Sequence, residues 1–267
     1  MSHLYKLHAR PKLNSPNMLA AWPGVGNVAT IVATYLKSKL GFRELGEVKA
    51  PHFFDPIGVV VRDNVVEAPQ FPENKFYYWK NKNKDTGGDL ILFVGDDQPM
   101  TKGYELAQCV LNVGLSFGVK RIYTCAAALT RMHHTEQPKV WGVATNQQLT
   151  DELKGHDLVQ RGNLHIAGLN GLLLGVAKER SVDGICLLGE VPAYATQVPN
   201  PMAALAIIGV LTRMLGVKID TLELAAQANE TKERMKQLAA QAMGEYIDLF
   251  TEPIWEQGTE EEEEEEE

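Results

Sequence analysis

Residues 89–118 read DLILFVGDDQPMTKGYELAQCVLNVGLSFG and contain one complete strand–loop–helix step. The run over 89–94 is almost continuously apolar, which is typical of a strand that is covered on both faces. Apolar residues then recur at helical spacing over 101–117 and stop before Gly118. A buried strand followed by an amphipathic helix predicts a parallel sheet with helices packed on it.

The same step recurs along the chain without a fixed repeat length. We therefore predict an α/β domain over residues 1–219, with three layers and a mostly parallel sheet that has helices on both faces. Strands are expected over 17–22, 44–50, 89–94, 120–128, 140–145, 164–167 and 184–188, with further extended segments over 58–62 and 65–79. Helices are expected over 27–40, 101–117, 146–153, 171–180 and 201–215.

The C-terminal part of the chain has a different composition. Residues 220–252 are rich in Ala, Gln, Glu and Lys with a helical apolar stripe, and predict a helical extension of one or two helices. Residues 253–267 end in eight consecutive glutamates, Glu260–Glu267, and predict a disordered acidic tail. Removing these eight from the 34 Asp and Glu leaves 26, which equals the 26 Lys and Arg.

The near-neutral charge of the body argues against nucleic-acid binding, because proteins that bind nucleic acids usually carry a basic stripe. No apolar run approaches the length of a membrane span, and no signal-peptide pattern is visible. Cys109, Cys125 and Cys186 lie in apolar segments without paired spacing, which indicates reduced packing residues. We expect a cytoplasmic protein that binds no membrane.

Ligands of open parallel sheets bind at the carboxyl ends of the strands. Gly24, Gly26 and Ala29 fit the G-x-G-x-x-[GA] pattern of dinucleotide sites after a predicted strand. Pro23 crowds this turn, so the glycines are better interpreted as residues that permit a tight bend. Gly24, Gly26 and Asn27 remain candidates for ligand binding.

Polar residues follow three other predicted strands. Asp96 and Asp97 follow the strand over 89–94, and such a carboxylate pair can hold a metal, divide acid and base roles or simply cap a turn. No His or Cys stands at ligand spacing beside the pair, so a metal is not favoured. Asn170 precedes the helix over 171–180, where it can cap the helix or help to hold an anion. Glu190 follows the strand over 184–188 and is either a pocket residue or part of a structural bend.

The histidines do not form a metal pattern. His133 and His134 are adjacent, and no His or Cys stands at ligand spacing beside them. His165 lies in the predicted strand over 164–167 and is expected to be a hydrogen-bonded core histidine. No P-loop, nucleophile elbow or H-E-x-x-H motif is present. We expect no metal and no cofactor.

Four segments carry a resemblance to a known family. They are AWPGVGNVATIVATYL (21–36), LFVGDDQP (92–99), HIAGLNGLLLGVAKERSVDGICLLGEVP (165–192) and PNPMAALAIIGVL (199–211). In order and spacing they resemble the proteasome-assembly-chaperone-like family of archaea and bacteria, over roughly residues 15–250. Members are sometimes described as ATP-grasp or carboxylate-amine-ligase-like, but this sequence has no glycine-rich lid or paired magnesium-binding acids.

The resemblance implies a phosphorylase/hydrolase-like three-layer fold, homo-oligomers, and relatives that act as chaperones for proteasome α-subunits. Some relatives dock on the proteasome through a C-terminal hydrophobic-Tyr-X tail, whereas this chain has glutamates at 260–267 and its nearest tyrosine is Tyr246. We expect a non-catalytic, protein-binding protein of the assembly-chaperone type, with proteasome subunits as the implied partner.

The alternative is a nucleosidase- or phosphorylase-like hydrolase that uses a cleft at the carboxyl ends of the strands. Asp97 or Glu190 would then be the acid or base, with Asp96 and Asn170 in the same pocket. This alternative requires all four side chains to converge on one cavity.

Overall fold

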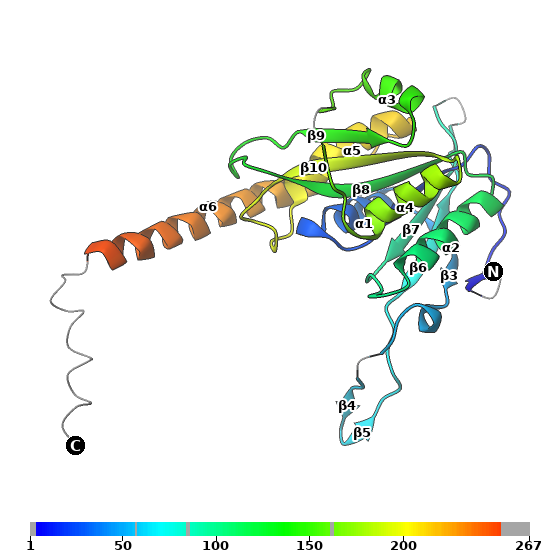
Figure 1. Ribbon diagram of the computed structural model, residues 1–267, viewed down its shortest axis with the longest axis horizontal. Helices are drawn as coiled ribbons and strands as arrows, with labels where there is room; N and C mark the ends of the chain where they lie inside the picture. Colours follow the sequence, from blue (N-terminus) through cyan, green and yellow to red (C-terminus); the bar gives the residue numbers. More distant parts are fainter. Residues whose placement is uncertain (1–3, 57, 84–85, 161–162, 252–267) are drawn as a thin grey trace.

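A single large sheet organises the chain. The computed structural model describes residues 4–56, 58–83, 86–160 and 163–251, with side chains described as far as Gln237. The sheet has eight strands in the order β1-β3-β6-β7-β2-β8-β10-β9 (Figure 1). These strands are β1 (Tyr5–Leu7), β2 (Asn17–Ala21), β3 (Arg43–Val48), β6 (Asn74–Trp79), β7 (Leu90–Gly95), β8 (Arg121–Thr130), β9 (Val140–Ala144) and β10 (Asp183–Pro192).

The centre of the sheet is parallel and its flanks are antiparallel. β7, β2, β8 and β10 run in one direction, and β8 pairs with β10 from Arg121↔Asp183 to Thr130↔Pro192. β6 is antiparallel to both β7 and β3, and β9 is antiparallel to β10. The described part of the connection between β6 and β7, residues 80–83 and 86–89, contains no helix, and a connection of this length favours antiparallel neighbours. The expected α/β architecture is confirmed, and the sheet is mixed.

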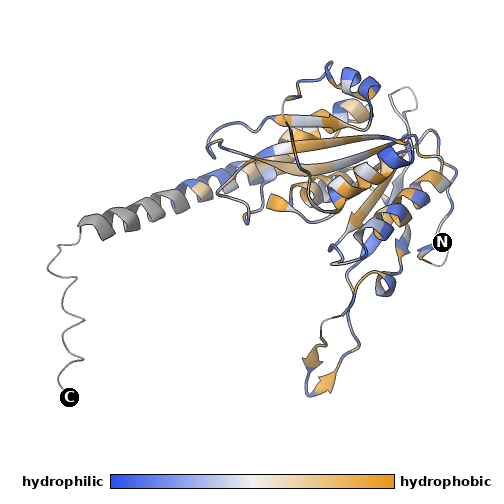
Figure 2. Cartoon of the chain, in the orientation of Figure 1, coloured by the Kyte–Doolittle hydropathy of each residue, from blue (hydrophilic) through white to orange (hydrophobic). Residues whose placement is uncertain are grey.

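Helices cover both faces of the sheet. α1 and α5 share one apolar core with the strands, and α2 and α4 share a second core on the other face. Figure 2 shows the apolar strands between helices whose outward surfaces are more hydrophilic. The helices of the body are α1 (Val28–Leu40), α2 (Gly103–Ser116), α3 (Gln147–Leu153), α4 (Gly168–Glu179) and α5 (Pro201–Leu215), with short 3-10 turns at Val25–Asn27 and Ala50–His52.

Three local predictions were wrong. The strand predicted over 184–188 continues to Pro192, because β8 provides a pairing partner for every residue of β10. The segment 164–167 is a loop with no strand partner, and α4 begins at Gly168, three positions before the predicted start. β1 was not predicted, since three residues at a sheet edge carry little pattern.

A hairpin leaves the body between β3 and β6. β4 (Val61–Arg62) and β5 (Val65–Val66) pair only with each other, and Asp63 and Asn64 form the turn with φ angles of 50° and 63°. Two positive φ angles are typical of a type I′ turn, which matches the twist of a hairpin. We call residues 58–67 the valine arm. Figure 1 shows it extending away from the sheet.

The C-terminal extension is one continuous helix, α6 (Leu222–Thr251). Its first turns are fixed to the body by a hydrogen bond from the Tyr35 hydroxyl to the Asp220 carbonyl and by an ion pair between Lys39 and Glu223. Its buried positions Leu224 and Ala228 and Met235 follow helical spacing. Beyond them α6 extends past the body (Figure 1), while the predicted acidic tail over 253–267 lies outside the described residues.

The burial of the thiols generates a prediction. All three cysteines are buried, and burial raises the pKa of Cys109 and of Cys186 to about 12. A raised pKa keeps the thiol neutral and unreactive near pH 8. A thiol-reactive chromogen should therefore label none of the three in the native protein within minutes, and all three in denaturant. Rapid stoichiometric labelling of the native protein would contradict this packing.

Candidate functional site

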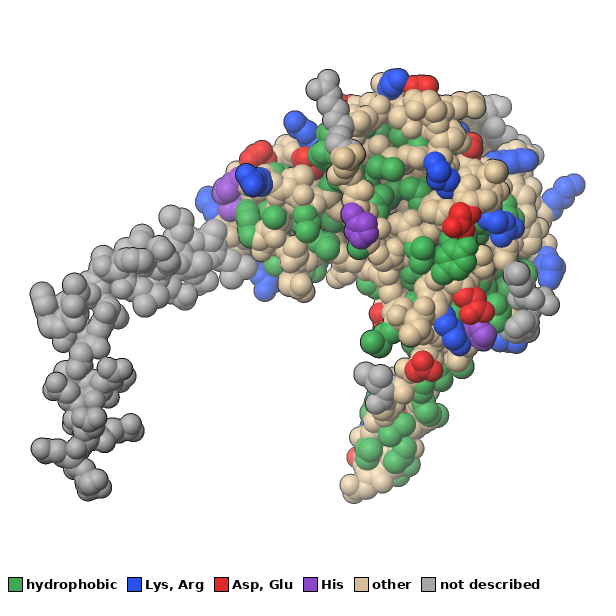
Figure 3. Space-filling model, viewed as in Figure 1, with side chains coloured by type: hydrophobic (Ala, Val, Ile, Leu, Met, Phe, Trp, Pro, Cys, Tyr) green, Lys and Arg blue, Asp and Glu red, His purple; other side chains and the backbone are tan. Residues whose placement is uncertain are grey.

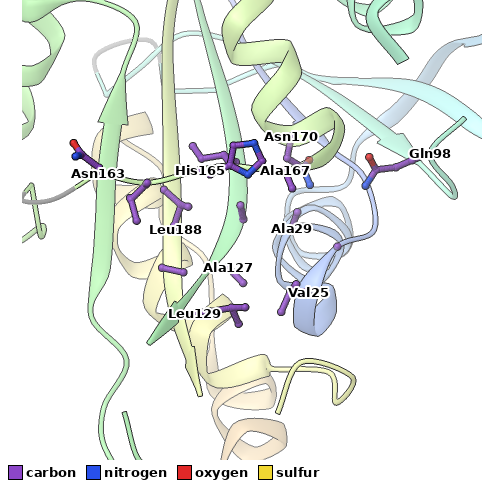
Figure 4. Close-up of a pocket in the computed structure, with 15 residues that line it drawn as sticks. Val25, Ala29, Gln98, Ala127, Leu129, Asn163, His165, Ala167, Asn170 and Leu188 are labelled. Atoms are coloured by element: carbon purple, nitrogen blue, oxygen red, sulfur yellow. The ribbon is translucent and has the colours of Figure 1, made fainter. Parts of the chain in front are cut away.

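The carboxyl ends of the central strands enclose a cavity of about 300 Å³. This is the position at which open α/β sheets usually bind ligands. Figure 4 shows side chains from the turn after β2, the end of β8 and the loop before α4 around the opening. The lining consists of Gly24, Val25, Ala29, Gln98, Ala126, Ala127, Ala128, Leu129, Asn163, Leu164, His165, Ile166, Ala167, Asn170 and Leu188.

Asn170 is committed to the end of β2. Its Oδ1 accepts a hydrogen bond from the Trp22 N–H at 3.0 Å, and its Nδ2 donates to the Trp22 carbonyl at 3.1 Å. Both residues are buried, so the amide satisfies backbone groups that water cannot reach. The predicted capping role was wrong, because α4 begins at Gly168 and Asn170 lies inside its first turn.

Gln98 braces the opposite side of the same cavity, and the sequence reasoning missed it. Its Nε2 donates to the Pro23 carbonyl at 2.6 Å, and its Oε1 accepts from the Leu169 N–H at 2.7 Å. The side chain thus ties the turn after β2 to the start of α4. Gly168 has a φ of 74° and approaches Gln98 so closely that a Cβ there would clash. In the sequence, the one indication of this role was the presence of a polar residue two positions after Asp96.

The glycine turn after β2 is held by hydrogen bonds between backbone groups. The Gly26 N–H donates to the Thr196 carbonyl, and the Asn27 N–H donates to the Gly24 carbonyl. Gly26 and Asn27 have φ angles of 61° and 50°, which explains the short side chains at this bend. Gly24 lines the cavity, whereas Gly26 and Asn27 do not appear on its lining.

The candidate carboxylates lie away from the cavity lining. One Asp96 oxygen accepts from the Glu73 N–H at 3.1 Å, and one Asp97 oxygen accepts from the Gln98 N–H at 2.7 Å. Glu190 lies within β10 and accepts from the Lys139 N–H at 3.0 Å and from the Trp141 indole at 3.1 Å. Of the four side chains that the hydrolase alternative brings together, only Asn170 lines the cavity.

The histidines are placed differently from the prediction. His165 is exposed and lines the cavity from a loop, so the expectation of a core histidine was wrong. His134 is buried, and its Nδ1 is 2.9 Å from the Tyr194 hydroxyl. Within the described residues, no group of three or more His, Cys, Asp and Glu side chains is arranged to hold a metal ion.

Exposed apolar side chains border the cavity. Val25, Leu129 and Leu164 all line it, and their exposed fractions are 38%, 51% and 42%. We call these three residues the apolar rim. Large apolar side chains exposed together around a cavity are typical of protein-interaction surfaces. The arrangement can bury apolar groups of a partner, and among the described residues that line the cavity His165 is the one titratable side chain.

Comparison with known proteins identifies the family. A model of the PAC2 family matches residues 18–239. The chain belongs to the PAC2 family. Among the described residues of this PAC2 protein, no helix is long and apolar enough to cross a membrane.

Several known proteins resemble this PAC2 protein over most of their length. The structure of Pyrococcus furiosus PbaB, an archaeal proteasome activator, is 31% identical with a TM-score of 0.76 and covers 88% of this chain and 98% of that one. Pyrococcus furiosus PbaA, an archaeal homologue of proteasome-assembly chaperone, is 24% identical with a TM-score of 0.65, over 91% and 99% of the two chains. The uncharacterized protein MJ1210 of Methanocaldococcus jannaschii is 25% identical over 230 residues, 85% of this chain and 84% of that protein.

These comparisons confirm the resemblance to homologues of proteasome-assembly chaperones. They give no support to the ATP-grasp or carboxylate-amine-ligase description. The likeness to PbaA lies below 25% identity and therefore concerns the fold.

The Asn170 amide generates a second prediction. Asn170→Leu keeps the side-chain volume but leaves the buried N–H and C=O of Trp22 without partners. We expect a loss of roughly 2–4 kcal/mol in the free energy of unfolding, measured by urea denaturation. Asn163→Leu is the matched control, because Asn163 lines the same cavity but is exposed. Equal stability of the two variants would contradict the structural role of Asn170.

Proposed function

We propose that this PAC2 protein is a non-catalytic protein-binding protein that acts in proteasome assembly or activation, with proteasome core subunits as its partner. The observation that carries the proposal is the character of the carboxyl edge of the sheet. There, the amides of Asn170 and Gln98 bind backbone groups, and no carboxylate appears on the described cavity lining. Of the exposed side chains that remain on the described lining, Val25, Leu129 and Leu164 are the large apolar ones, and Asn163 and His165 are polar.

The relatives supply the identity of the partner in this proposal. PbaB is an archaeal proteasome activator and, at 31% identity, is similar in sequence as well as fold. The activity of a PAC2 protein would then arise from complementary surfaces, because apolar burial drives most protein association. Protein binding also fits the near-neutral body that the charges of the sequence give.

Three finer features belong to the same proposal. We place the protein in the cytoplasm as a homo-oligomer, and we assign its three layers to the phosphorylase/hydrolase-like arrangement. The buried, neutral thiols fit a reducing compartment. The domain division at residue 219 is retained as a proposal, since α6 begins at Leu222.

The binding proposal is tested with purified 20S core particles and isolated α-subunits from the source organism. Immobilised full-length protein should bind one of these in biolayer interferometry, and an unrelated protein ring of similar size should not bind. Peptide hydrolysis by the core particle is the second readout. Failure to bind the core particle and every isolated subunit would overturn the proposed partner.

The hydrolase alternative makes an opposite prediction. We expect the purified protein to release no base from a panel of nucleosides, with or without phosphate, because Asp97 and Glu190 bind backbone and indole donors elsewhere. Liquid chromatography measures the products. Turnover that Asp97→Asn or Glu190→Gln abolishes would establish an enzyme and contradict the proposed function.

A further inference from the structure

The valine arm is an exposed apolar element with a defined conformation. Val59, Val60, Val61, Val65 and Val66 are exposed by 51%, 41%, 59%, 66% and 63%. The two-residue turn fixes the hairpin, and the Glu67 N–H extends its ladder to the Val60 carbonyl. Figure 3 shows hydrophobic side chains gathered along the arm, away from the body.

The arm lacks a stabilising surface within its own chain. An isolated two-stranded hairpin is marginally stable in water, and most hairpins need a third strand or a packed face. Residues 58–66 of the arm are exposed and Glu67 is half-buried, so the body buries none of them. Five uncovered valines leave roughly 300–450 Å² of apolar surface over the two faces of the hairpin, with Val61 and Val66 paired on one face and Val65 opposite Arg62 on the other.

The arm and the apolar rim lie at the same edge of the sheet. β3 runs parallel to the central strands and ends at Val48, and β6 begins at Asn74 opposite Gly95, the last residue of β7. The arm, which connects β3 to β6, therefore emerges at the carboxyl edge, where the cavity also opens. Because the arm extends away from its own body, the cavity that it can reach is on another molecule (Figure 1).

The two surfaces match in chemistry. Among the lining residues that the structure describes, His165 is the one titratable side chain, so an occupant with few charges has a small desolvation cost. On the arm, Arg62 and Glu67 form an ion pair at 3.1 Å, which neutralises both groups beside the valines. A volume of about 300 Å³ corresponds to about ten water-sized groups, enough for several valine side chains.

The area favours a second copy of this chain. One arm docked on one foreign surface buries roughly 300–450 Å² on each side, which is the range of weak encounters. In a reciprocal pair each copy supplies one arm and one receiving cavity, so each partner buries roughly 600–900 Å², about the standard interface.

We propose that two copies of this chain associate by exchanging valine arms, and that each arm inserts its valines into the cavity of the other copy against the apolar rim. This deepens the proposed function and rests on its interpretation of the carboxyl edge as a protein-binding surface, for which it names a first occupant. The pair has two-fold symmetry, and the same residues serve as donor and acceptor on both copies.

The first test measures the self-association of the full-length chain alone by sedimentation velocity. Wild type should be a dimer at micromolar concentration. Val65→Glu on the arm and Leu129→Glu on the rim should each weaken dimerisation on the order of 100-fold, because each places a charge in both contacts. Leu222→Glu is the matched control, since Leu222 is 77% exposed at the start of α6, and it should remain dimeric.

Mixing the two disrupted variants tests the exchange itself. The intact arm of Leu129→Glu can enter the intact cavity of Val65→Glu, so the mixture should associate more tightly than either variant alone. It should associate more weakly than wild type, because only one of its two contacts is intact. Val65→Cys and Leu129→Cys should then be joined by a short bismaleimide across two chains, because the native thiols are buried. Val65→Cys and Leu222→Cys should not be joined.

The sedimentation and cross-linking experiments contain no proteasome, so their outcomes test arm exchange separately from the proposed function. A monomeric wild type, dimers that survive both Glu substitutions, or a mixture that associates no more tightly than either variant alone would each overturn arm exchange. None of these results decides whether the protein binds core particles, which the interferometry measures independently.

Discussion

The structure depends on how the buried backbone at the end of β2 satisfies its hydrogen bonds. Trp22 is fully buried, and the chain leaves the sheet there, so its N–H and C=O have no strand partner to use. Asn170 supplies both partners from α4. Gln98 repeats the arrangement one residue further on by joining the Pro23 carbonyl to the Leu169 N–H. Two amides therefore hold β2, β7 and α4 in one arrangement.

This constraint explains the character of the carboxyl edge. The amides of Asn170 and Gln98, which an α/β enzyme could present to a substrate, are used here to complete the fold, and the large side chains exposed around the cavity are the apolar Val25, Leu129 and Leu164. An apolar surface of this kind gains free energy by covering other apolar surface. The protein-binding proposal for this PAC2 protein agrees with this chemistry.

The sequence predicted the features that depend on local pattern. The apolar run over 89–94 became β7, and the helix predicted over 201–215 is α5, which Asn200 caps by accepting a hydrogen bond from the Ala203 N–H at its Oδ1. Features that depend on partners distant in the sequence could not be predicted from local pattern. Glu190 seemed to end a strand because the ten-residue pairing of β10 with β8 cannot be read from β10 alone. The role of Gln98 likewise requires knowledge of which loops meet.

Native-state amide hydrogen exchange at Trp22 and Leu169, followed by NMR, tests most directly the claim that the carboxyl edge is held by side-chain amides. Both N–H groups bind a side-chain oxygen and lie outside the strand ladders. The account predicts that they exchange as slowly as the core strand amides of β7, through global unfolding. Exchange of either group at the rate of an open loop would show that the amide brace does not form, and would contradict the account.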